Sequence, residues 1–367
     1  MKKNLVYVGH EYHKKTKSVE FLIEIFQRKY NVYYMTYNDK TGQIEGDKDA
    51  FGKMFEVLVL FQMPVPVETL RKTFIFKHGA YFPMYDGTGE APNYFWLDYK
   101  EFNIINFSRT LHERLLGMGL SSYYIQYFPK TTEHLIRGKY NKAFFWQRRD
   151  VININTVCDL LSKSTVKSIH LHKSVDPGQK YIEPTELQKK IYSFSYSTWY
   201  VKKEDMLEDV EDAGIYIAPR EYEGIGMSFL EAMAMGKCVI APNHPTMNEY
   251  IQSGFNGYLY DIYNVKPIDN MEVDKIQQNT FQYMQEGFKN WEKTKYDILG
   301  WLEKDVKINP TLMEKTYKEK FVIGKKYIGR RILLVTLEEG GIYRLFGKFK
   351  ISKRIVGVAK IIRKKGT

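Results

Sequence analysis

The stretch EYEGIGMSFLEAMAMG, residues 221–236, contains two acidic residues whose spacing suits a ligand-binding site. Glu223 directly precedes a Gly-x-Gly turn, and Glu231 follows eight positions later, one turn into the helix predicted by the small and apolar residues. A carboxylate accepts hydrogen bonds from neighbouring hydroxyls, such as those of a ribose or another sugar. The pattern therefore predicts a ligand built of nucleoside, diphosphate and sugar, with one acid at each end.

The turn between the two acids suits the anionic centre of such a ligand. Gly224 and Gly226 let the backbone approach closely. The N–H groups of Met227 and Ser228, at the predicted helix start, suit a diphosphate. Taken alone, the spacing also fits an acidic loop followed by a helix that its own dipole stabilises.

Strand and helix patterns that alternate along the chain must position these residues. Short apolar strand patterns fall at residues 4–10, 31–37, 56–64, 73–79, 102–108 and 121–129, and then at 142–147, 168–174, 197–201, 214–219 and 237–242. Helical spacing follows Ser18, a predicted N-cap, and recurs at 110–119, 154–163, 203–213 and 227–236. Buried strands separated by helices predict α/β domains with parallel, doubly wound sheets.

The pattern restarts near residue 142, which predicts two Rossmann-like domains, at residues 1–140 and 141–275. A helical segment at 276–310 and a basic tail at 311–367 follow. Such domains bind ligands at the carboxyl ends of their strands. Neither first loop carries a full Gly-x-Gly-x-x-Gly, which disfavours a dinucleotide.

The composition is that of a globular protein, with 44% hydrophobic residues among 367. The sequence contains no run of about 18 apolar residues, which is the length needed to span a bilayer. The start, MKKNLVYVGHEYHKK, lacks the apolar core of a signal peptide and predicts a first strand instead. Cys158 and Cys238 each lie in an apolar segment, so reduced core thiols and a cytoplasmic protein are expected.

The positive charge is confined to the end of the chain. Residues 311–367 hold 16 Lys or Arg and 4 Asp or Glu, which accounts for the whole formal net charge of +12. Residues 342–365 interleave apolar side chains with cations, which predicts binding to an anionic membrane surface at the inner face of the cell membrane. A solvated terminal helix or hairpin is the alternative. The neutral body argues against a nucleic-acid partner.

Residues 218–261, APREYEGIGMSFLEAMAMGKCVIAPNHPTMNEYIQSGFNGYLYD, resemble the signature stretch of retaining GT-B glycosyltransferases, and of glycosyltransferase family 4 (the group 1 glycosyltransferases) in particular. The shared features are the two glutamates, the small-residue helix, a strand, an acid at Glu249 and a glycine-bearing turn. The resemblance implies two Rossmann-like domains facing each other across a cleft, the first on the acceptor side and the second binding the nucleotide sugar. It also implies that Glu223 contacts the donor sugar and Glu231 the ribose.

The implied activity is transfer of a hexosyl group from a nucleotide-diphosphate sugar to an acceptor hydroxyl with retention. A saccharide or lipid-linked saccharide acceptor in surface polysaccharide assembly is expected because of the basic tail. A GT-B sugar-nucleotide epimerase and a catalytically silent partner subunit remain as alternatives.

The resemblance suggests further site residues in the first domain. His78 is expected to end the fourth strand at the interdomain face, near the reacting sugar, although a histidine in the core fits the same pattern. Gly9 ends the first strand, where the family has a glycine-bearing loop beside the donor. An ordinary strand-to-helix turn is the alternative for Gly9.

The cations for the departing diphosphate are expected in FFWQRRD, at Arg148 and Arg149, with Arg148 preferred. The family has a lysine a few residues later, where this chain has Ile154 and Asn155. Lys173 is a possible substitute, or else an exposed structural lysine. No His, Cys or carboxylate cluster has metal-ligand spacing, so no metal and no cofactor are expected.

Overall fold

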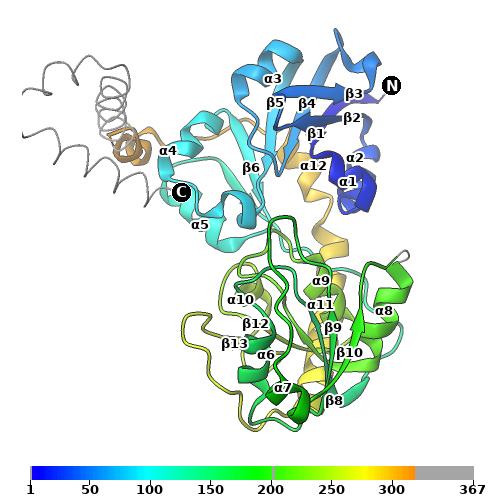
Figure 1. Cartoon of the computed structure of the whole chain (residues 1–367). Helices are drawn as coiled ribbons and strands as arrows, with labels where there is room; N and C mark the ends of the chain where they lie inside the picture. The colour runs from blue at the N-terminus through cyan, green and yellow to red at the C-terminus, as the bar shows by residue number, and fades with distance from the viewer. Residues whose placement is uncertain (1, 201–202, 319–367) are drawn as a thin grey trace, which may run out of the picture. The chain divides into compact units, whose positions relative to one another are not determined.

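The computed structural model describes residues 2–200 and 203–318. The chain divides into two compact units, residues 1–309 and residues 310–367. The first unit contains both sheets (Figure 1). In the second unit, residues 310–318 are helical, and the predicted membrane-binding segment 342–365 lies outside the described residues.

The first sheet is parallel except at one edge. Its strands lie in the order β3-β2-β1-β4-β5-β6-β7, and only β3 pairs antiparallel among the described residues. They are β1 (Lys3–Gly9), β2 (Tyr30–Asn38), β3 (Gln43–Gly46), β4 (Met54–Phe61), β5 (Ile75–Phe82), β6 (Phe102–Asn106) and β7 (Ser122–Tyr124). The helices between them are α1 (Glu11–Thr16), α2 (Glu20–Gln27), α3 (Val67–Thr73), α4 (Asn93–Trp96) and α5 (Arg109–Gly117). Continuous apolar runs form the central strands because both faces of a parallel sheet are covered.

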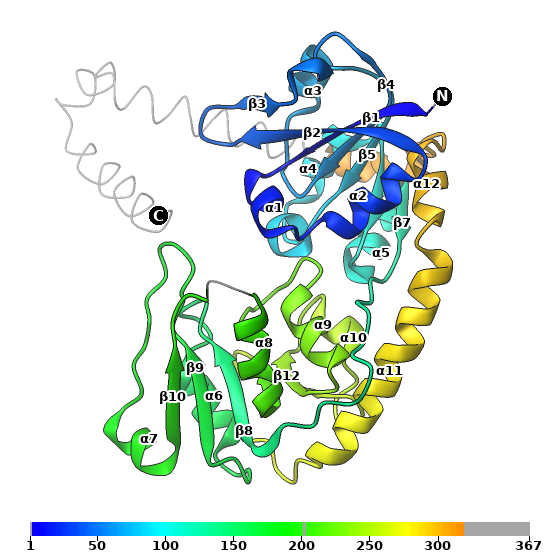
Figure 2. The same cartoon turned by 90° about the vertical axis from the view of Figure 1, so that its right-hand side faces the viewer.

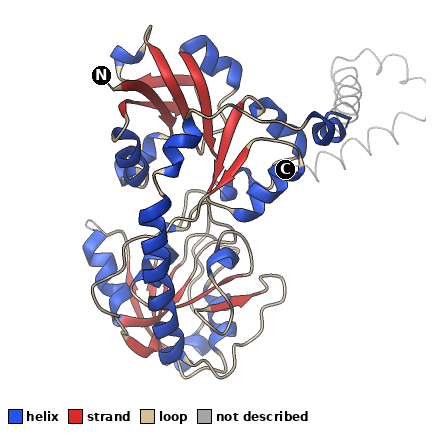
Figure 3. Cartoon of the chain, turned by 180° about the vertical axis from the view of Figure 1, so that it is seen from behind, coloured by secondary structure: helices blue, strands red, loops and turns tan. Residues whose placement is uncertain are grey.

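The second sheet is parallel throughout its described strands, in the order β10-β9-β8-β11-β12-β13. Its strands are β8 (Lys139–Trp146), β9 (Ser168–His172), β10 (Ser193–Ser197), β11 (Ala213–Ile217), β12 (Cys238–Pro242) and β13 (Tyr258–Tyr260). Its helices are α6 (Ile154–Leu161), α7 (Glu186–Ile191), α8 (Lys203–Asp212), α9 (Met227–Ala234) and α10 (Met247–Tyr250). Figure 3 shows helices on both sides of the strands, which confirms the predicted doubly wound architecture.

Two helices return the chain to the first domain. The long helix α11 (Val273–Thr294) begins beside the second sheet, and α12 (Asp297–Leu302) packs against β5 and β6 of the first (Figure 2). The side-chain amide of Asn103, in β6, donates to the carbonyl oxygens of Trp301 and Lys304 at 3.1 and 2.6 Å. These bonds fasten the end of the crossover segment to the sheet with which the chain begins.

The structure adds to or changes several of the local predictions. Helix α1 and strand β3 were not predicted, because both are short and neither buries an apolar stripe. Val19, rather than Ser18, is the N-cap of α2. The strand expected at 197–201 lies earlier, as β10, because SFSYS pairs with β9 at the sheet edge and its exposed positions hide the apolar signal.

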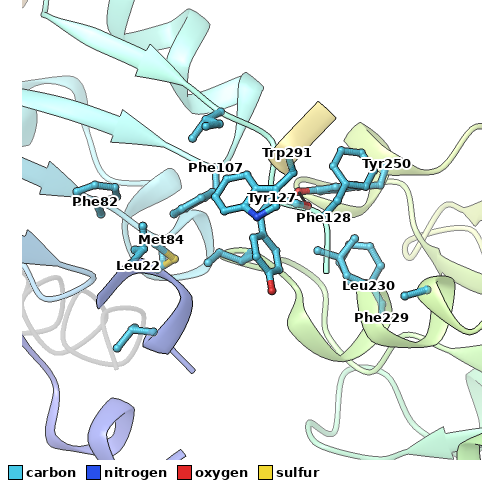
Figure 4. Packing of buried hydrophobic residues seen from close by; sticks show 14 of the residues in the cluster. Leu22, Phe82, Met84, Phe107, Tyr127, Phe128, Phe229, Leu230, Tyr250 and Trp291 are labelled. Carbon is cyan, nitrogen blue, oxygen red and sulfur yellow. Dashed lines mark hydrogen bonds between the residues drawn. The ribbon is translucent and has the colours of Figure 1, made fainter. Parts of the chain in front are cut away.

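An aromatic core joins the two sheets around the linker that follows β7. Tyr127 meets Trp291 of α11 edge to face at 5.1 Å between ring centroids, and Phe128 meets Tyr250 of α10 in the same way at 5.4 Å (Figure 4). The Tyr250 hydroxyl also donates to the Tyr127 carbonyl at 2.9 Å. Gly287 of α11 leaves room for Phe128, whose ring lies 2.2 Å from the position of an added Cβ. The linker is therefore packed on both sides rather than solvated.

Glu249 of α10 caps a helix of the other domain. Its carboxylate accepts hydrogen bonds from the Ser108 hydroxyl at 2.8 Å and from the N–H groups of Arg109 and Thr110 at 2.6 and 3.0 Å, at the start of α5. A carboxylate at a helix N-terminus satisfies otherwise unpaired N–H groups and interacts well with the helix dipole. The acid singled out in the signature stretch thus holds the two domains together.

Replacing Glu249 with alanine should lower the free energy of unfolding by about 1–2 kcal/mol, because the N–H groups at the start of α5 lose a charged acceptor. Urea denaturation followed by far-UV circular dichroism measures this. The control is Glu186→Ala, which removes an exposed acid paired with Lys189 and should cost less than about 0.5 kcal/mol. Equal stability of Glu249→Ala and the control would contradict the capping role.

Candidate active site

The loop between β11 and α9 buries the first of the two glutamates. Glu223 is only 6% exposed, and its Oε1 has no hydrogen-bond partner. Burial raises the pKa of the carboxyl to about 7, although the positive charge of Arg220 opposes the rise. An unpartnered buried carboxylate oxygen is costly, so this atom is a candidate acceptor for a ligand hydroxyl.

The two glycines of the loop are required for different physical reasons. Gly226, the N-cap of α9, has a φ of +85°, and an added Cβ would lie 1.9 Å from the Phe229 ring. Gly224 approaches the first domain so closely that a Cβ would lie 2.8 Å from the Cβ of Met84. Gly226 has no side chain that could cap the helix. The N–H groups of Met227 and Ser228 at the start of α9 therefore have no side-chain acceptor from the N-cap residue.

Glu231 lines a small pocket beside the first turn of α9. Ser228 of the same helix shares this pocket with Trp146, the last residue of β8, and with Tyr216 of β11. Interaction with Ser228 also lowers the pKa of the Tyr216 hydroxyl, against the larger rise caused by its burial. The predicted partners Ser228 and Glu231 thus meet at the carboxyl ends of two neighbouring strands.

A cluster of opposite charges lies beside this loop, around Asp176. Arg148 donates from Nε to Oδ1 of Asp176 at 3.0 Å, and Arg220 donates from Nη2 to Oδ2 at 2.9 Å. Arg220 also donates from Nη1 to Oδ2 of Asp86 at 3.0 Å. Asp86 belongs to the short π-helical segment Tyr85–Gly89 that follows β5 of the first domain. Charged groups of both domains therefore gather close to Glu223.

Sequence reasoning missed three members of this cluster, Arg220, Asp86 and Asp176. Arg220 stands inside the quoted signature stretch, three residues before Glu223, and that was the available signal. The two aspartates carry no motif. Burial raises the pKa of Asp86, whereas the positive charge of Arg220 lowers it.

The other predicted cations take different positions. Arg149 is exposed, and its charge is one of those that lower the pKa of Asp86. Lys173 pairs with Glu183 at 3.1 Å, and its Nζ lies 4.1 Å from the centroid of the Tyr196 ring. The contacts described for Lys173 are thus with exposed and aromatic groups rather than with the arginine cluster.

Gly9 ends β1, as predicted, and the chain continues into α1 at that edge of the first sheet. An added Cβ at Gly9 would lie 2.6 Å from the hydroxyl of the buried Tyr7. A side chain at this position would collide with the core, so the glycine is needed for packing whatever else it does.

The predicted position of His78 is wrong. Strand β5 runs on to Phe82, because the buried AYF that follows the histidine extends the apolar pattern. The His78 Nε2 lies 4.0 Å from Oε1 of Glu56, which also pairs with Lys3. Lys3 is the first residue of β1, so this group lies toward the amino ends of the strands, away from the edge that carries Asp86.

Other predictions concern metals, thiols and membranes. Among the described residues, no group of three or more His, Cys, Asp or Glu side chains is placed to hold a metal ion. Both cysteines are unpaired and buried. Over residues 2–200 and 203–318, no helix combines the length and apolar character needed to cross a membrane.

Residues 176–277 match the family model described as "Glycosyl transferases group 1". Among curated proteins, sucrose synthase 5 of Oryza sativa subsp. japonica is 25% identical over 146 residues, which is 40% of this chain and 16% of that protein. Sucrose synthase 7 of the same plant aligns to the same extent. The chain thus spans only a small part of the length of the curated relatives it matches.

Solved structures share the fold at low identity. Anabaena Alr3699/HepE in complex with UDP is 12% identical, with a TM-score of 0.55 over 81% of this chain and 99% of that one. Sucrose-phosphate synthase from Thermosynechococcus elongatus is 11% identical, with a TM-score of 0.53 over 88% and 100%. The lipopolysaccharide outer core galactosyltransferase WaaB is 14% identical, with a TM-score of 0.51 over 80% and 99%.

The family match covers Asp176, Arg220, Glu223 and Glu231, whereas Asp86 and Arg148 of the same site lie outside the matched segment. The strand order of both sheets and the structural relatives agree with the predicted pair of Rossmann-like domains. The chain therefore has the GT-B fold, and its residues 176–277 match the model of the group 1 glycosyltransferases.

Proposed function

We propose that this chain transfers a hexosyl group from a nucleotide-diphosphate sugar to an acceptor hydroxyl with retention of configuration. The observation that carries the proposal is the meeting of three features at the carboxyl ends of the strands of the second sheet. They are the unpartnered buried oxygen of Glu223, the guanidinium of Arg148 and the first turn of α9. They supply an acceptor for a sugar hydroxyl, a cation and N–H donors for a diphosphate. The family match and the UDP complex of Alr3699/HepE support the same reading.

In this mechanism the protein stabilises the leaving group. Negative charge builds on the diphosphate as the glycosidic bond breaks, and Arg148, Arg149 and the α9 terminus offset it without a metal. Glu223 holds the donor sugar, and Glu231 holds the ribose beside the first turn of α9. The leaving diphosphate takes the acceptor proton on the same face of the sugar, so no protein nucleophile is assigned.

Two other functions are separated from this one by a single assay. A GT-B sugar-nucleotide epimerase would return an altered sugar nucleotide, and a silent partner subunit would bind nucleotide without turnover. We would incubate the full chain with a panel of uridine and guanosine diphosphate sugars in the presence of a chelator, and analyse the products chromatographically. Slow release of nucleoside diphosphate and free sugar is expected. Activity that vanishes with the chelator and returns with a divalent ion would contradict the metal-free mechanism.

We also propose that the acceptor is a saccharide or lipid-linked saccharide in surface polysaccharide assembly, and that the protein works peripherally at the inner face of the cell membrane. The support is the position of the whole net charge within residues 311–367. Lysines and arginines near an anionic leaflet contribute about 1 kcal/mol each, so a few of these 16 cations would hold the protein there.

The full-length protein should therefore sediment with vesicles that contain anionic lipid at low salt, and less so in about 1 M salt, where charges are screened within about 3 Å. A chain cut after Gly341 loses nine of the 16 cations and should stay in the supernatant. Vesicles of neutral lipid are the control. Full-length protein that ignores anionic vesicles at low salt would sink the membrane proposal.

A further inference from the structure

The family's second phosphate-binding cation has no counterpart at its usual place in this chain. Ile154, where the lysine is expected, is fully buried as the first residue of α6. The side chain of Asn155 accepts a hydrogen bond from Gln188 of α7 at 2.8 Å. Arg148 and the exposed Arg149 are the predicted cations that remain, and a partly buried cation beside them would stabilise the diphosphate further.

Arg220 has the geometry for this task. It and Arg148 bind the two oxygens of the same Asp176 carboxylate, at 2.9 and 3.0 Å, which fixes both guanidinium groups side by side. Arg220 also stands in the loop that leads to Gly226 and the start of α9. Its Nε is buried without a hydrogen-bond partner, so its donor capacity is not exhausted.

Asp86 of the first domain binds this same guanidinium, through Nη1 at 3.0 Å. Burial disfavours the charged form of the Asp86 carboxyl, whereas the positive charges of the three arginines stabilise it. The three arginines at positions 148, 149 and 220 face three acids, Asp86, Asp176 and Glu223. The charges of the cluster are thus balanced in number, so a further anion competes with the carboxylates for the guanidinium groups.

We propose that Arg220 is a further cation of the diphosphate site beside Arg148, in place of the family's lysine, and that the donor's diphosphate displaces the Asp86 carboxylate from it. This inference rests on the proposed function, since it assigns a residue to the leaving group of that reaction. Asp176 then acts as a positioning residue, because it keeps the two guanidinium groups together in both states. Asp86 is the carboxylate to leave, since it belongs to the other domain and contacts the cluster through Arg220.

The test is isothermal titration calorimetry of the full chain with uridine and guanosine diphosphates and with the matching monophosphates. Arg220→Gln should weaken binding of the diphosphate by about tenfold or more, as expected for a lost charge-assisted hydrogen bond. The monophosphate should lose less than about threefold, since it lacks the β-phosphate, and Arg220→Lys should fall between wild type and Arg220→Gln. The matched control is Lys173→Gln, which should change neither affinity, because Lys173 pairs with Glu183.

The Asp86→Asn variant should change the affinity for diphosphate in the opposite direction. It removes the competing carboxylate and should strengthen diphosphate binding about threefold to tenfold, with thermal unfolding used to verify that each variant is folded. Each of three outcomes would overturn the inference. The first is a diphosphate affinity of Arg220→Gln within twofold of wild type, the second is an equal loss for mono- and diphosphate, and the third is weaker diphosphate binding by Asp86→Asn. A wild-type protein that binds none of these nucleotides would instead refute the proposed function, so the two failures are told apart by the wild-type titration.

Discussion

Replacing Glu223 with glutamine should make the ligand-free protein more stable than wild type above pH 7, and about equally stable near pH 4.5. Burial raises the pKa of this carboxyl from 4.5 to about 7 in the folded chain. The folded state therefore binds the proton more tightly than the unfolded state, so wild type loses stability as the pH rises through this window. A pKa shift of this size corresponds to about 3 kcal/mol of folding stability that wild type loses at high pH. The Glu223→Gln variant keeps this stability, because glutamine has no ionisable proton.

Urea denaturation at several pH values between 4.5 and 8 measures this difference. The control is Glu221→Gln, which removes a half-buried acid of the same loop whose carboxylate accepts a bond from the Tyr263 hydroxyl. That variant should keep the pH dependence of wild type. If Glu223→Gln and wild type lose stability in parallel from pH 4.5 to 8, the buried carboxyl does not carry the raised pKa.

The same variant separates the roles of the two glutamates. Because Glu223 is assigned to the donor sugar, Glu223→Gln should bind nucleoside diphosphate within about twofold of wild type, while turnover falls about a hundredfold, as for other lost electrostatic contacts to a reacting group. Steady-state kinetics and calorimetry on the same preparation give both numbers. A large loss of nucleoside diphosphate affinity would mean that Glu223 contacts the nucleotide instead.

Replacing Glu231 with alanine should weaken binding of nucleoside diphosphate by about 1.5–3 kcal/mol, which is about tenfold to a hundredfold in the dissociation constant. The reason is the loss of a charged acceptor for ribose hydroxyls beside the first turn of α9, where Glu231 and Ser228 meet. Nucleoside monophosphate should lose as much, because the ribose is common to both. This pattern differs from that expected of Arg220→Gln, which affects the diphosphate selectively.

Calorimetric titration of each nucleotide into the variant tests the ribose assignment. A suitable control is Glu208→Ala, on the exposed side of α8, the helix that contributes Met206 to the pocket. It should leave both affinities unchanged. Monophosphate and diphosphate affinities of Glu231→Ala equal to those of wild type would remove Glu231 from the site.

Much of the fold follows from local sequence patterns. The buried runs that became β1, β4 and β6 have the length and apolar character of parallel strands, and their order with intervening helices predicts two Rossmann-like domains. The loop before α9 was equally predictable, because a glycine at Gly226 and a helix pattern directly after it define a strand-to-helix turn. Edge elements such as β3 and β10 were missed or shifted, since half-exposed residues carry a weak periodic signal.

His78 shows where a local pattern misleads. The motif FIFKHG suggested a strand ending at the histidine, but the four residues that follow it are also buried and prolong β5. A shift of four residues along a strand moves a side chain about 13 Å. This distance separates the middle of β5 from the carboxyl ends of the strands, where the ligand site was expected. The sequence pattern defines a strand's existence better than its ends.

By itself the sequence determined the alternation of strands and helices, the Glu223 turn, the small-residue helix that carries Glu231, and the resemblance of this stretch to the group 1 glycosyltransferases. Those features depend on residues close in the chain, whose periodicity and backbone preferences act locally. Only the tertiary structure decided that Asp86, Asp176 and Arg220 meet, and that Glu249 caps α5. Arg220 is 134 positions from Asp86 and 44 from Asp176, and such contacts depend on which strand ends share an edge and how the two domains face each other. Neither spacing nor propensity encodes this, because ion pairs between distant segments leave no period in the sequence.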